Sequence, residues 1–306
     1  MKTVPRHATQ HASQHASQRV PPAESVAALA PGRPRAADTH RVSRGGARAR
    51  PPAWRAPIAT ALSVLIGLLA WEVAGRWLVS NPILFAPFSR VLAAGFSQWQ
   101  QGRLAHDVAI SLLEFALGFT LASVLGVAGG LALGLSRGTR LIFEPWAKIL
   151  YASPLVALMP FFILVFGIGI ASKVAIVATV AVMPILFNTA SGVRSVDSAW
   201  HDVAHAFECS RLQTLVHVVL PAALPTILVG MRLAVGRGLT GVAVGELFAA
   251  QAGLGYLITT AGQSFDTPTL LFGVACFSVL GVLLMAALDA LERVARRGRE
   301  PAGEMR

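Results

Sequence analysis

The sequence predicts an all-α membrane protein with six transmembrane helices, and three observations lead to this fold class. Charged residues make up 13% of the 306 residues, about half their share in soluble domains, while hydrophobic residues reach 54%. Six stretches are long enough to cross about 30 Å of hydrocarbon as helices. The formal net charge of +11 is concentrated in one terminal segment. A soluble globule could not cover its surface with this composition, so soluble-domain functions are excluded.

Residues 1–57 are predicted to form a disordered basic tail. They hold 10 of the 26 Lys and Arg residues and 2 of the 15 Asp and Glu residues, which leaves a net charge of +3 on the remainder. A His-Ala-Ser/Thr-Gln repeat begins at His7, His11 and His15, without apolar periodicity. Because the basicity belongs to the tail, we expect no nucleic acid partner. Without acidic or cysteine co-ligands nearby, we expect no metal site at the repeat.

The six predicted spans follow one another along residues 58–295. The third contains two prolines, Pro154 and Pro160, which are expected to break it, and the fifth is unusual because it contains two arginines. Residues 296–306 are expected to form a C-terminal tail. The spans are 58–71 with a continuation to 79, 115–136, 149–167, 174–193, 226–247 and 267–288.

Arginine and lysine residues are distributed unequally among the connections between spans. The positive-inside rule places the Arg-rich connections, and therefore both chain termini, in the cytoplasm. An amphipathic pattern over residues 87–101 predicts a short helix on the outer membrane surface. The inner segments contain the tail, Arg137, Arg140, Arg194, Arg211, Arg293, Arg296, Arg297 and Arg299, and the outer segments contain Arg90, Arg103 and Lys173.

The second span carries a ridge of small residues. Gly118, Ala122, Gly126, Gly130 and Gly134 recur at intervals of four. One helix face is therefore nearly free of side chains, and a neighbouring helix can approach it closely. We expect a packing surface there, with a sliding surface for a moving gate as the alternative.

A polar segment, residues 195–221, separates the fourth and fifth spans. Its apolar residues fall on two stripes, which predicts two short amphipathic helices joined at about residues 208–211. A hairpin that lies on lipid headgroups is one interpretation.

This segment resembles the EAA loop of ATP-binding-cassette (ABC) importer permeases and is most similar to the nitrate, sulfonate and taurine branch. The resemblance rests on DVAHAFECSRLQT at 202–214 and VVLPAALP at 218–225, and it spans roughly residues 58–295. Further matching pieces occur in the same order: PLVALMP (154–160), FGIG (166–169), PILFNT (184–189), GVR (192–194), GMRLA (230–234), GEL (245–247) and GLGYLI (253–258).

The resemblance implies a type I ABC importer permease bundle in the bacterial inner membrane. Its loop, at about 195–221, would dock on separate ABC ATPase subunits, and ATP hydrolysis there would drive translocation of a small anionic solute of the sulfonate, taurine or nitrate class. The other implied partners are a periplasmic or extracellular substrate-binding protein, a second copy of the permease, and membrane lipid. The residues at coupling positions are Asp202, Ala204, Glu208, Ser210, Arg211 and Pro221.

Two coupling positions depart from the family pattern. Asp202 replaces the leading Glu, and Glu208 replaces the Gly that permits a left-handed turn between the helices. A non-Gly residue in that conformation costs about 1 kcal/mol. Either the turn is rebuilt in this protein or coupling is weaker.

Polar residues inside the spans are the candidates for the translocation path: Arg232, Arg237, Glu246 and Asn188. Arg232 and Glu246 are 14 residues apart, hence on one helix face but about 21 Å apart along the axis. They cannot pair directly. Arg232 is either a positive contact for an anionic solute or a structural residue that pairs with Asp197, Asp202 or a carbonyl group, and Arg237 is the weaker path candidate.

The chain lacks the Gly-x-x-x-x-Gly-Lys-Ser/Thr motif, so we expect neither ATP binding nor enzymatic activity, and no cofactor. A GLSRG string at 134–138 matches a nucleophile elbow, but it follows a membrane helix and is interpreted as coincidence. The alternative function is an ATP-independent secondary transporter or channel. It would require ion-coupling carboxylates within the membrane, for which Glu114 and Glu246 are the candidates.

Overall fold

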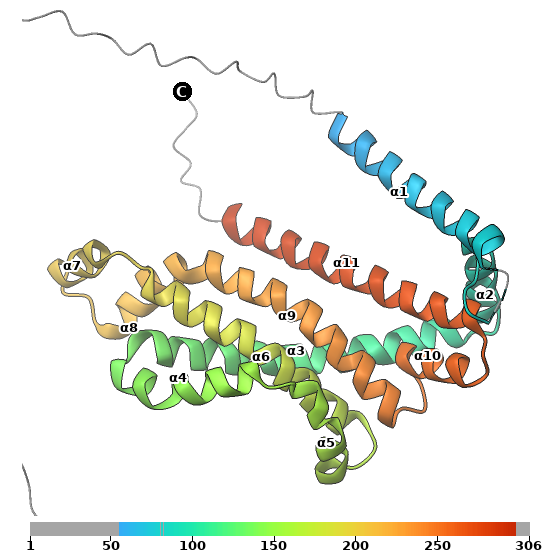
Figure 1. The fold of residues 1–306 in the computed structure, drawn as a ribbon. Helices are drawn as coiled ribbons and strands as arrows, with labels where there is room; N and C mark the ends of the chain where they lie inside the picture. The colour runs from blue at the N-terminus through green and yellow to red at the C-terminus, as the bar shows by residue number, and fades with distance from the viewer. Residues whose placement is uncertain (1–54, 80, 82, 298–306) are drawn as a thin grey trace, which may run out of the picture. The chain divides into compact units, whose positions relative to one another are not determined.

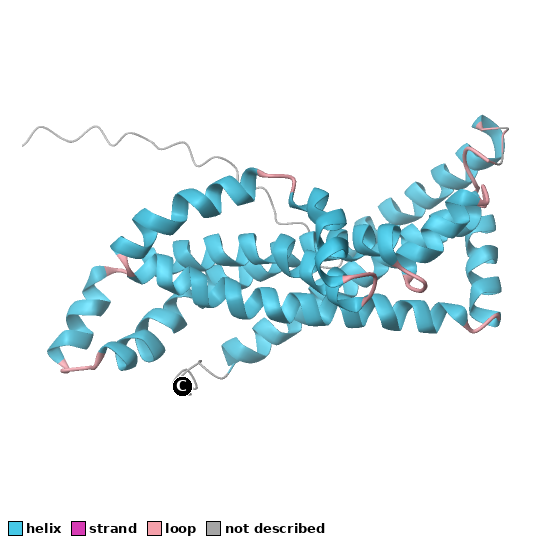
Figure 2. Ribbon diagram, turned by 90° about the horizontal axis from the view of Figure 1, so that it is seen from below, coloured by secondary structure: helices cyan, strands magenta, loops and turns pink. Residues whose placement is uncertain are grey.

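The computed structural model describes residues 55–79, 81 and 83–297, and every regular element in these ranges is helical (Figures 1 and 2). The predicted tails at 1–57 and 296–306 therefore lie almost wholly outside the described residues. The elements are α1 (Arg55–Val73), a π-helical turn (Ala74–Leu78), α2 (Phe88–Gln100), α3 (Arg103–Leu135), α4 (Arg137–Ala152), a 3₁₀ turn (Leu155–Leu158), α5 (Met159–Phe166), α6 (Ile170–Arg194), α7 (Ser198–Ala206), α8 (Arg211–Thr214), a second π-helical turn (Leu215–Val219), α9 (Leu220–Ala249), α10 (Leu254–Gln263) and α11 (Thr267–Arg297).

Six segments overlap the six predicted spans, which confirms the predicted fold class. Five are single helical stretches long and apolar enough to cross a membrane, and the sixth is a bent pair. In that pair, Arg137–Ala152 and Leu155–Phe166 meet at 87°. The single stretches are Ile58–Leu78, Arg103–Leu135, Ile170–Arg194, Arg211–Phe248 and Thr267–Arg293.

The bend in the third span has one proline as its cause. Ser153 has φ −78° and ψ 148°, an extended conformation that the residue before a proline prefers, so α4 ends there. Pro160 instead lies in the first turn of α5, where its missing N–H interrupts no helical hydrogen bond. Of the two prolines expected to break this span, only Pro154 does so.

The core of the bundle is α6, which packs between α3 and α9. A Cβ atom added to Gly118 would lie 2.5 Å from Val177, and one added to Gly130 would lie 2.5 Å from Thr189. The small-residue ridge of α3 is therefore in direct contact with α6, and the predicted packing surface is confirmed. Its α6 partners also recur at multiples of four: Val177, Ile185, Thr189 and Val193.

The bundle has two different ends, seen in Figure 1. The hairpin end carries α7 and α8, and the α10 end carries α2 and α10. At the α10 end, α2 is the predicted amphipathic helix. Its Gly95 packs against Phe272 of α11, while Leu92 and Phe96 are exposed.

Candidate functional site

The α7–α8 hairpin, residues 197–214, joins α6 to the α9 region, and both of its helices begin at a capping side chain. Asp197 Oδ1 accepts a hydrogen bond from the N–H of Ala199 at 3.0 Å. Ser210 Oγ accepts one from the N–H of Gln213 at 3.3 Å, and Gln213 Oε1 accepts one from the N–H of Ser210 at 2.8 Å. These caps fix where each helix of the hairpin starts.

The turn between the two helices keeps the left-handed geometry. Glu208 has φ 53°. Its N–H donates to the carbonyl oxygen of His205 at 2.9 Å, and the N–H of Cys209 donates to that of Ala204 at 3.0 Å. This pair of bonds is the Schellman motif that usually ends a helix at Gly. The turn is therefore not rebuilt around Glu208, which instead occupies the strained position.

The second helix of the hairpin differs from the prediction, because it is not a separate helix. α8, the π-helical turn Leu215–Val219 and α9 follow one another without a gap, and Arg211–Phe248 is a single candidate span. Pro221 lies in the first turn of α9. A proline there cannot donate to the carbonyl oxygen of His217, and a widened turn is a common way to accommodate such a break. The hairpin and α9 are thereby connected by continuous helical backbone.

The hairpin presents apolar side chains on its surface. Trp200 is 59% exposed, Phe207 79% and Leu212 69%. A cavity of about 910 Å³ lies between the hairpin and the end of α3, with His201, His205, Cys209 and Arg211 in its lining. Of the six predicted coupling residues, Asp202, Glu208, Ser210 and Arg211 are exposed, Pro221 is half-buried and Ala204 is buried.

Arg232 pairs with α11 and not with the hairpin. Its Nη2 donates to Asp289 Oδ1 at 2.5 Å and to Glu292 Oε2 at 2.9 Å. Arg232 therefore forms an ion pair, as expected for a structural residue, but its partners are not Asp197 and Asp202. The reason is that α9 packs beside α11. This contact joins residues far apart in the sequence, so no local sequence pattern predicts it.

Arg237 has a different environment, although it follows Arg232 by only five residues. Its guanidinium carbon lies 5.5 Å from the centre of the Tyr151 ring of α4. That ring in turn packs against Phe187 of α6, with centroids 5.4 Å apart. The residue is exposed, and no carboxylate in the described ranges forms an ion pair with it.

Asn188 lies where α6 crosses α9. Its Nδ2 donates to the carbonyl oxygen of Pro184 at 2.8 Å, and its Cβ is the nearest atom to a Cβ placed on Gly230, at 2.7 Å. The amide therefore satisfies the backbone of its own helix at a close helix crossing.

Glu246 anchors the start of α10 and is 1% exposed. Its Oε2 accepts a hydrogen bond from the N–H of Gly255 at 2.5 Å, and its Oε1 accepts one from Ser111 Oγ at 2.6 Å. Ser111 Oγ accepts from the N–H of Leu254 at 2.9 Å, and Asp107 Oδ1 accepts from that of Gly253 at 2.9 Å. Three consecutive N–H groups that a helix start leaves unpaired are thus bound by side chains of α3 and α9.

Glu114 and Lys173 complete this buried charge cluster, which consists of Asp107, Ser111, Glu114, Lys173 and Glu246. Lys173 Nζ forms an ion pair with Glu114 Oε1, and the two residues are 5% and 1% exposed. Glu114 and Glu246, the two candidate ion-coupling carboxylates of the secondary-transporter alternative, thus lie in one buried cluster. The sequence did not predict that Asp107, Ser111 and Lys173 belong to one site. The only local feature that pointed to it was Lys173, a charged residue at the start of an apolar run.

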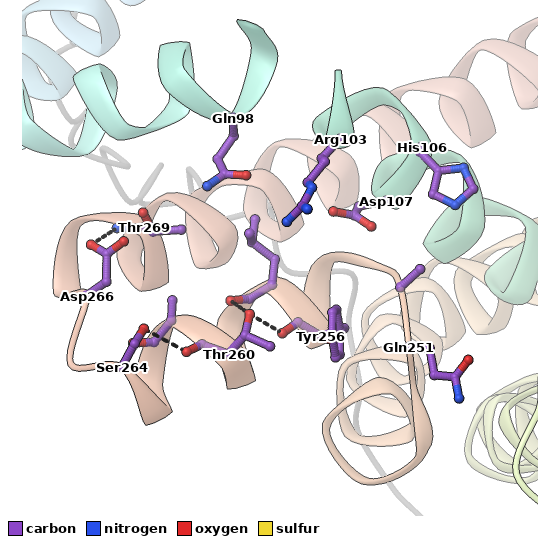
Figure 3. Close-up of a pocket in the computed structure, with 13 residues that line it drawn as sticks. Gln98, Arg103, His106, Asp107, Gln251, Tyr256, Thr260, Ser264, Asp266 and Thr269 are labelled. Carbon is purple, nitrogen blue, oxygen red and sulfur yellow. Dashed lines mark hydrogen bonds between the residues drawn. The ribbon is translucent and has the colours of Figure 1, made fainter. Parts of the chain in front are cut away.

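A polar pocket of about 440 Å³ opens beside this cluster at the α10 end. Figure 3 shows Gln98 and Arg103 projecting into it from the side opposite Tyr256 and Thr260. Asp107 belongs to both the pocket lining and the cluster. Within the described ranges, no group of three His, Cys, Asp or Glu side chains could hold a metal ion.

Comparison with known proteins defines the class of protein to which this bundle belongs. Residues 123–297 match the family described as the binding-protein-dependent transport system inner membrane component. The chain therefore belongs to this family of ABC importer permeases. It is a multi-pass inner membrane protein that is not itself an ATPase, and its partners are an ATPase and a binding protein. The alternative of an ATP-independent transporter is not supported.

Individual relatives are similar over most of the chain. A putative aliphatic sulfonates transport permease protein of Bacillus subtilis (strain 168) is 37% identical over 73% of this chain and 81% of its own length. The taurine transport system permease protein of Escherichia coli (strain K12) is 33% identical over 78% of this chain and 91% of its own. Among solved structures, an inward-facing MetNI methionine ABC transporter shares the fold, with a TM-score of 0.57, 18% identity, and coverage of 64% of this chain and 97% of that one.

Proposed function

We propose that this permease carries small anionic solutes of the sulfonate and taurine class into the cell. The support comes from the two relatives described as sulfonate and taurine permeases, at 37% and 33% identity. Nitrate is the third solute in this proposal, because it is also a small monovalent oxyanion.

The α7–α8 hairpin is the element that we assign to ATPase docking, and the observation that carries this assignment is its continuity with α9. The hairpin is capped at both helix starts and exposes Trp200, Phe207 and Leu212. Apolar side chains gathered on a polar, capped segment are typical of a protein contact surface. Because α8 runs into α9, movement of the ATPase would shift α9 with little loss in a flexible joint.

The proposal includes an orientation of the permease in the membrane. The hairpin end and both termini are cytoplasmic, and the α10 end faces the binding protein. The pocket with Gln98 and Arg103 then belongs to the surface on which the binding protein docks. We further assign a homodimer of the permease, since a single copy leaves most of the α4–α5 surface uncovered.

Copurification with the ATPase tests the docking assignment. Exchanging Phe207 and Leu212 for Ser should release the ATPase from the purified permease, whereas exchanging Phe96 and Leu92, which are also more than half exposed but lie at the α10 end, should not. Retention of the ATPase by both double variants would contradict the assignment of the hairpin.

Uptake assays test the solute class. Vesicles that contain the complete transporter should accumulate labelled taurine or an alkanesulfonate in an ATP-dependent manner, and unlabelled nitrate or sulfonate should compete. Accumulation only of solutes that lack a sulfonate or other oxyanion group would show that this solute class is wrong while leaving the family assignment intact.

A further inference from the structure

Arg237 lies deep within a membrane-crossing helix. Twelve residues separate it from the end of α9 at Ala249, which corresponds to about 18 Å along the helix axis. A charge at such a depth is unfavourable, and it is found facing other protein groups or a water-filled path. Arg237 is therefore unlike the arginines in the connections, whose charge is solvated.

The two arginines of α9 are neutralised differently. Arg232 donates to two carboxylates of α11, whereas Arg237 forms no ion pair with any carboxylate in the described ranges. Its contact is the face of the Tyr151 ring at 5.5 Å. An aromatic face attracts the cation but occupies none of the five N–H donors at the edge of the guanidinium. The positive charge and its hydrogen-bond donors are thus available to a ligand.

Arg237 borders a face of α9 that the subunit itself leaves open. A Cβ atom added to the neighbouring Gly236 would have nothing within 4 Å, and Thr240, one turn further on, is also exposed. The same open stripe continues towards the hairpin end through Leu233 and Val229. Lipid is a poor occupant for this stripe at the level of Arg237, because hydrocarbon cannot solvate an unpaired guanidinium.

Three spans hold the guanidinium in place. Tyr151 comes from the last turns of α4, two residues before the bend at Ser153, and Phe187 comes from α6. The aromatic pair forms a platform below Arg237, so the charge is positioned by α4 and α6 as well as by its own helix. A charge held in this way is preorganised for recognition.

We propose that Arg237, seated on Tyr151, is the contact that recognises the anion during translocation. This inference rests on the proposed function. A guanidinium presents a planar fork of donors that matches two oxygens of a sulfonate or another small oxyanion. Arg232 is excluded from this role because its charge is already balanced by Asp289 and Glu292. The sequence alone favoured the opposite order of the two arginines.

The test uses the complete transporter, with its ATPase and binding protein, in vesicles and with labelled taurine as the probe. Arg237→Gln should lower the maximal uptake rate about tenfold or more, the effect of losing one charge-assisted interaction. Arg237→Lys, which keeps the charge but loses the planar fork of donors, should fall between the Gln variant and the wild type. Tyr151→Phe should behave like the wild type, whereas Tyr151→Leu should resemble the loss of the charge.

A second measurement separates recognition from a structural role. The concentration of loaded binding protein that gives half-maximal uptake should not change in Arg237→Gln, because docking takes place elsewhere. The variant should also retain the oligomeric state and melting temperature of the wild type.

Three outcomes would overturn the inference: uptake by Arg237→Gln equal to that of the wild type, equal losses in the Gln and Lys variants, or dissociation of the permease dimer. The last would show that Arg237 contacts a second copy. If wild-type vesicles fail to take up taurine, alkanesulfonates and nitrate alike, the proposed function fails instead.

Discussion

The two ends of the bundle differ in which side chains are buried: charged side chains are buried at the α10 end, and aromatic side chains are exposed at the hairpin end. At the α10 end, Glu114, Lys173 and Glu246 are each at most 5% exposed, Lys173 pairs with Glu114, and Glu246 binds the backbone of α10. At the hairpin end, Trp200 and Phe207 are more than half exposed although the backbone around them is fully capped. The polar cluster at the α10 end is thus enclosed within the subunit, whereas we expect the apolar side chains at the hairpin end to be covered by the ATPase that we propose docks there.

The helix α9 connects these two ends. It follows the hairpin through the π-helical turn Leu215–Val219, and Glu246 near its last turn binds the start of α10. A displacement applied at the hairpin therefore meets a helix that is fixed at the other end.

The largest effect is expected at the α10 end. Lys173→Met leaves the Glu114 carboxylate buried without its cation, which should lower the free energy of unfolding by about 3–5 kcal/mol. Thermal unfolding in detergent measures the change. The double variant Lys173→Met with Glu114→Leu should recover much of the loss, because the buried carboxylate that lost its cation is then also removed.

The matched control is Lys148→Met, which removes an exposed ion pair with Glu144. An exposed pair contributes about 0–1 kcal/mol, so its loss should be barely measurable. Equal shifts in the two single variants would show that burial of the cluster is not what stabilises the α10 end.

An intermediate effect is expected in the core that both ends share. Gly130→Ala places a Cβ atom 2.5 Å from Thr189 and 2.7 Å from the carbonyl oxygen of Leu186, so α3 and α6 must separate. Overpacking of this kind should lower the free energy of unfolding by about 1–3 kcal/mol. Gly67→Ala, with nothing within 4 Å, is the control and should be neutral or slightly stabilising. A neutral Gly130→Ala would contradict the close contact of the ridge.

The smallest effect is expected at the hairpin end. Glu208→Gly relieves the left-handed strain and should stabilise the turn by about 1 kcal/mol, whereas Glu208→Ala keeps the strain and should not. Hydrogen exchange of the α7 and α8 amides measures the local change. Faster exchange in the Gly variant would show that the Glu208 side chain itself supports the turn.

Local sequence features predicted much of this fold because their physical cause is local. The conformation before Pro154 ends α4, and the four-residue spacing of small residues makes the α3 ridge. Each effect acts within a few residues of its cause. The hairpin continued into α9 where separate helices were predicted, because the break at Pro221 is absorbed by a widened turn.

The sequence by itself determined that the chain is a helical membrane protein, where its spans lie, and that a polar, amphipathic segment separates the fourth span from the fifth. Only the tertiary structure decided which charges are balanced. The partners are far apart in the sequence: Arg232 and Asp289 are separated by 57 residues, Lys173 and Glu114 by 59, and Ser111 and Glu246 by 135. Periodicity specifies the face of a helix on which a residue lies but not the helix that packs there. The free energy of a charge in a membrane depends on that neighbour.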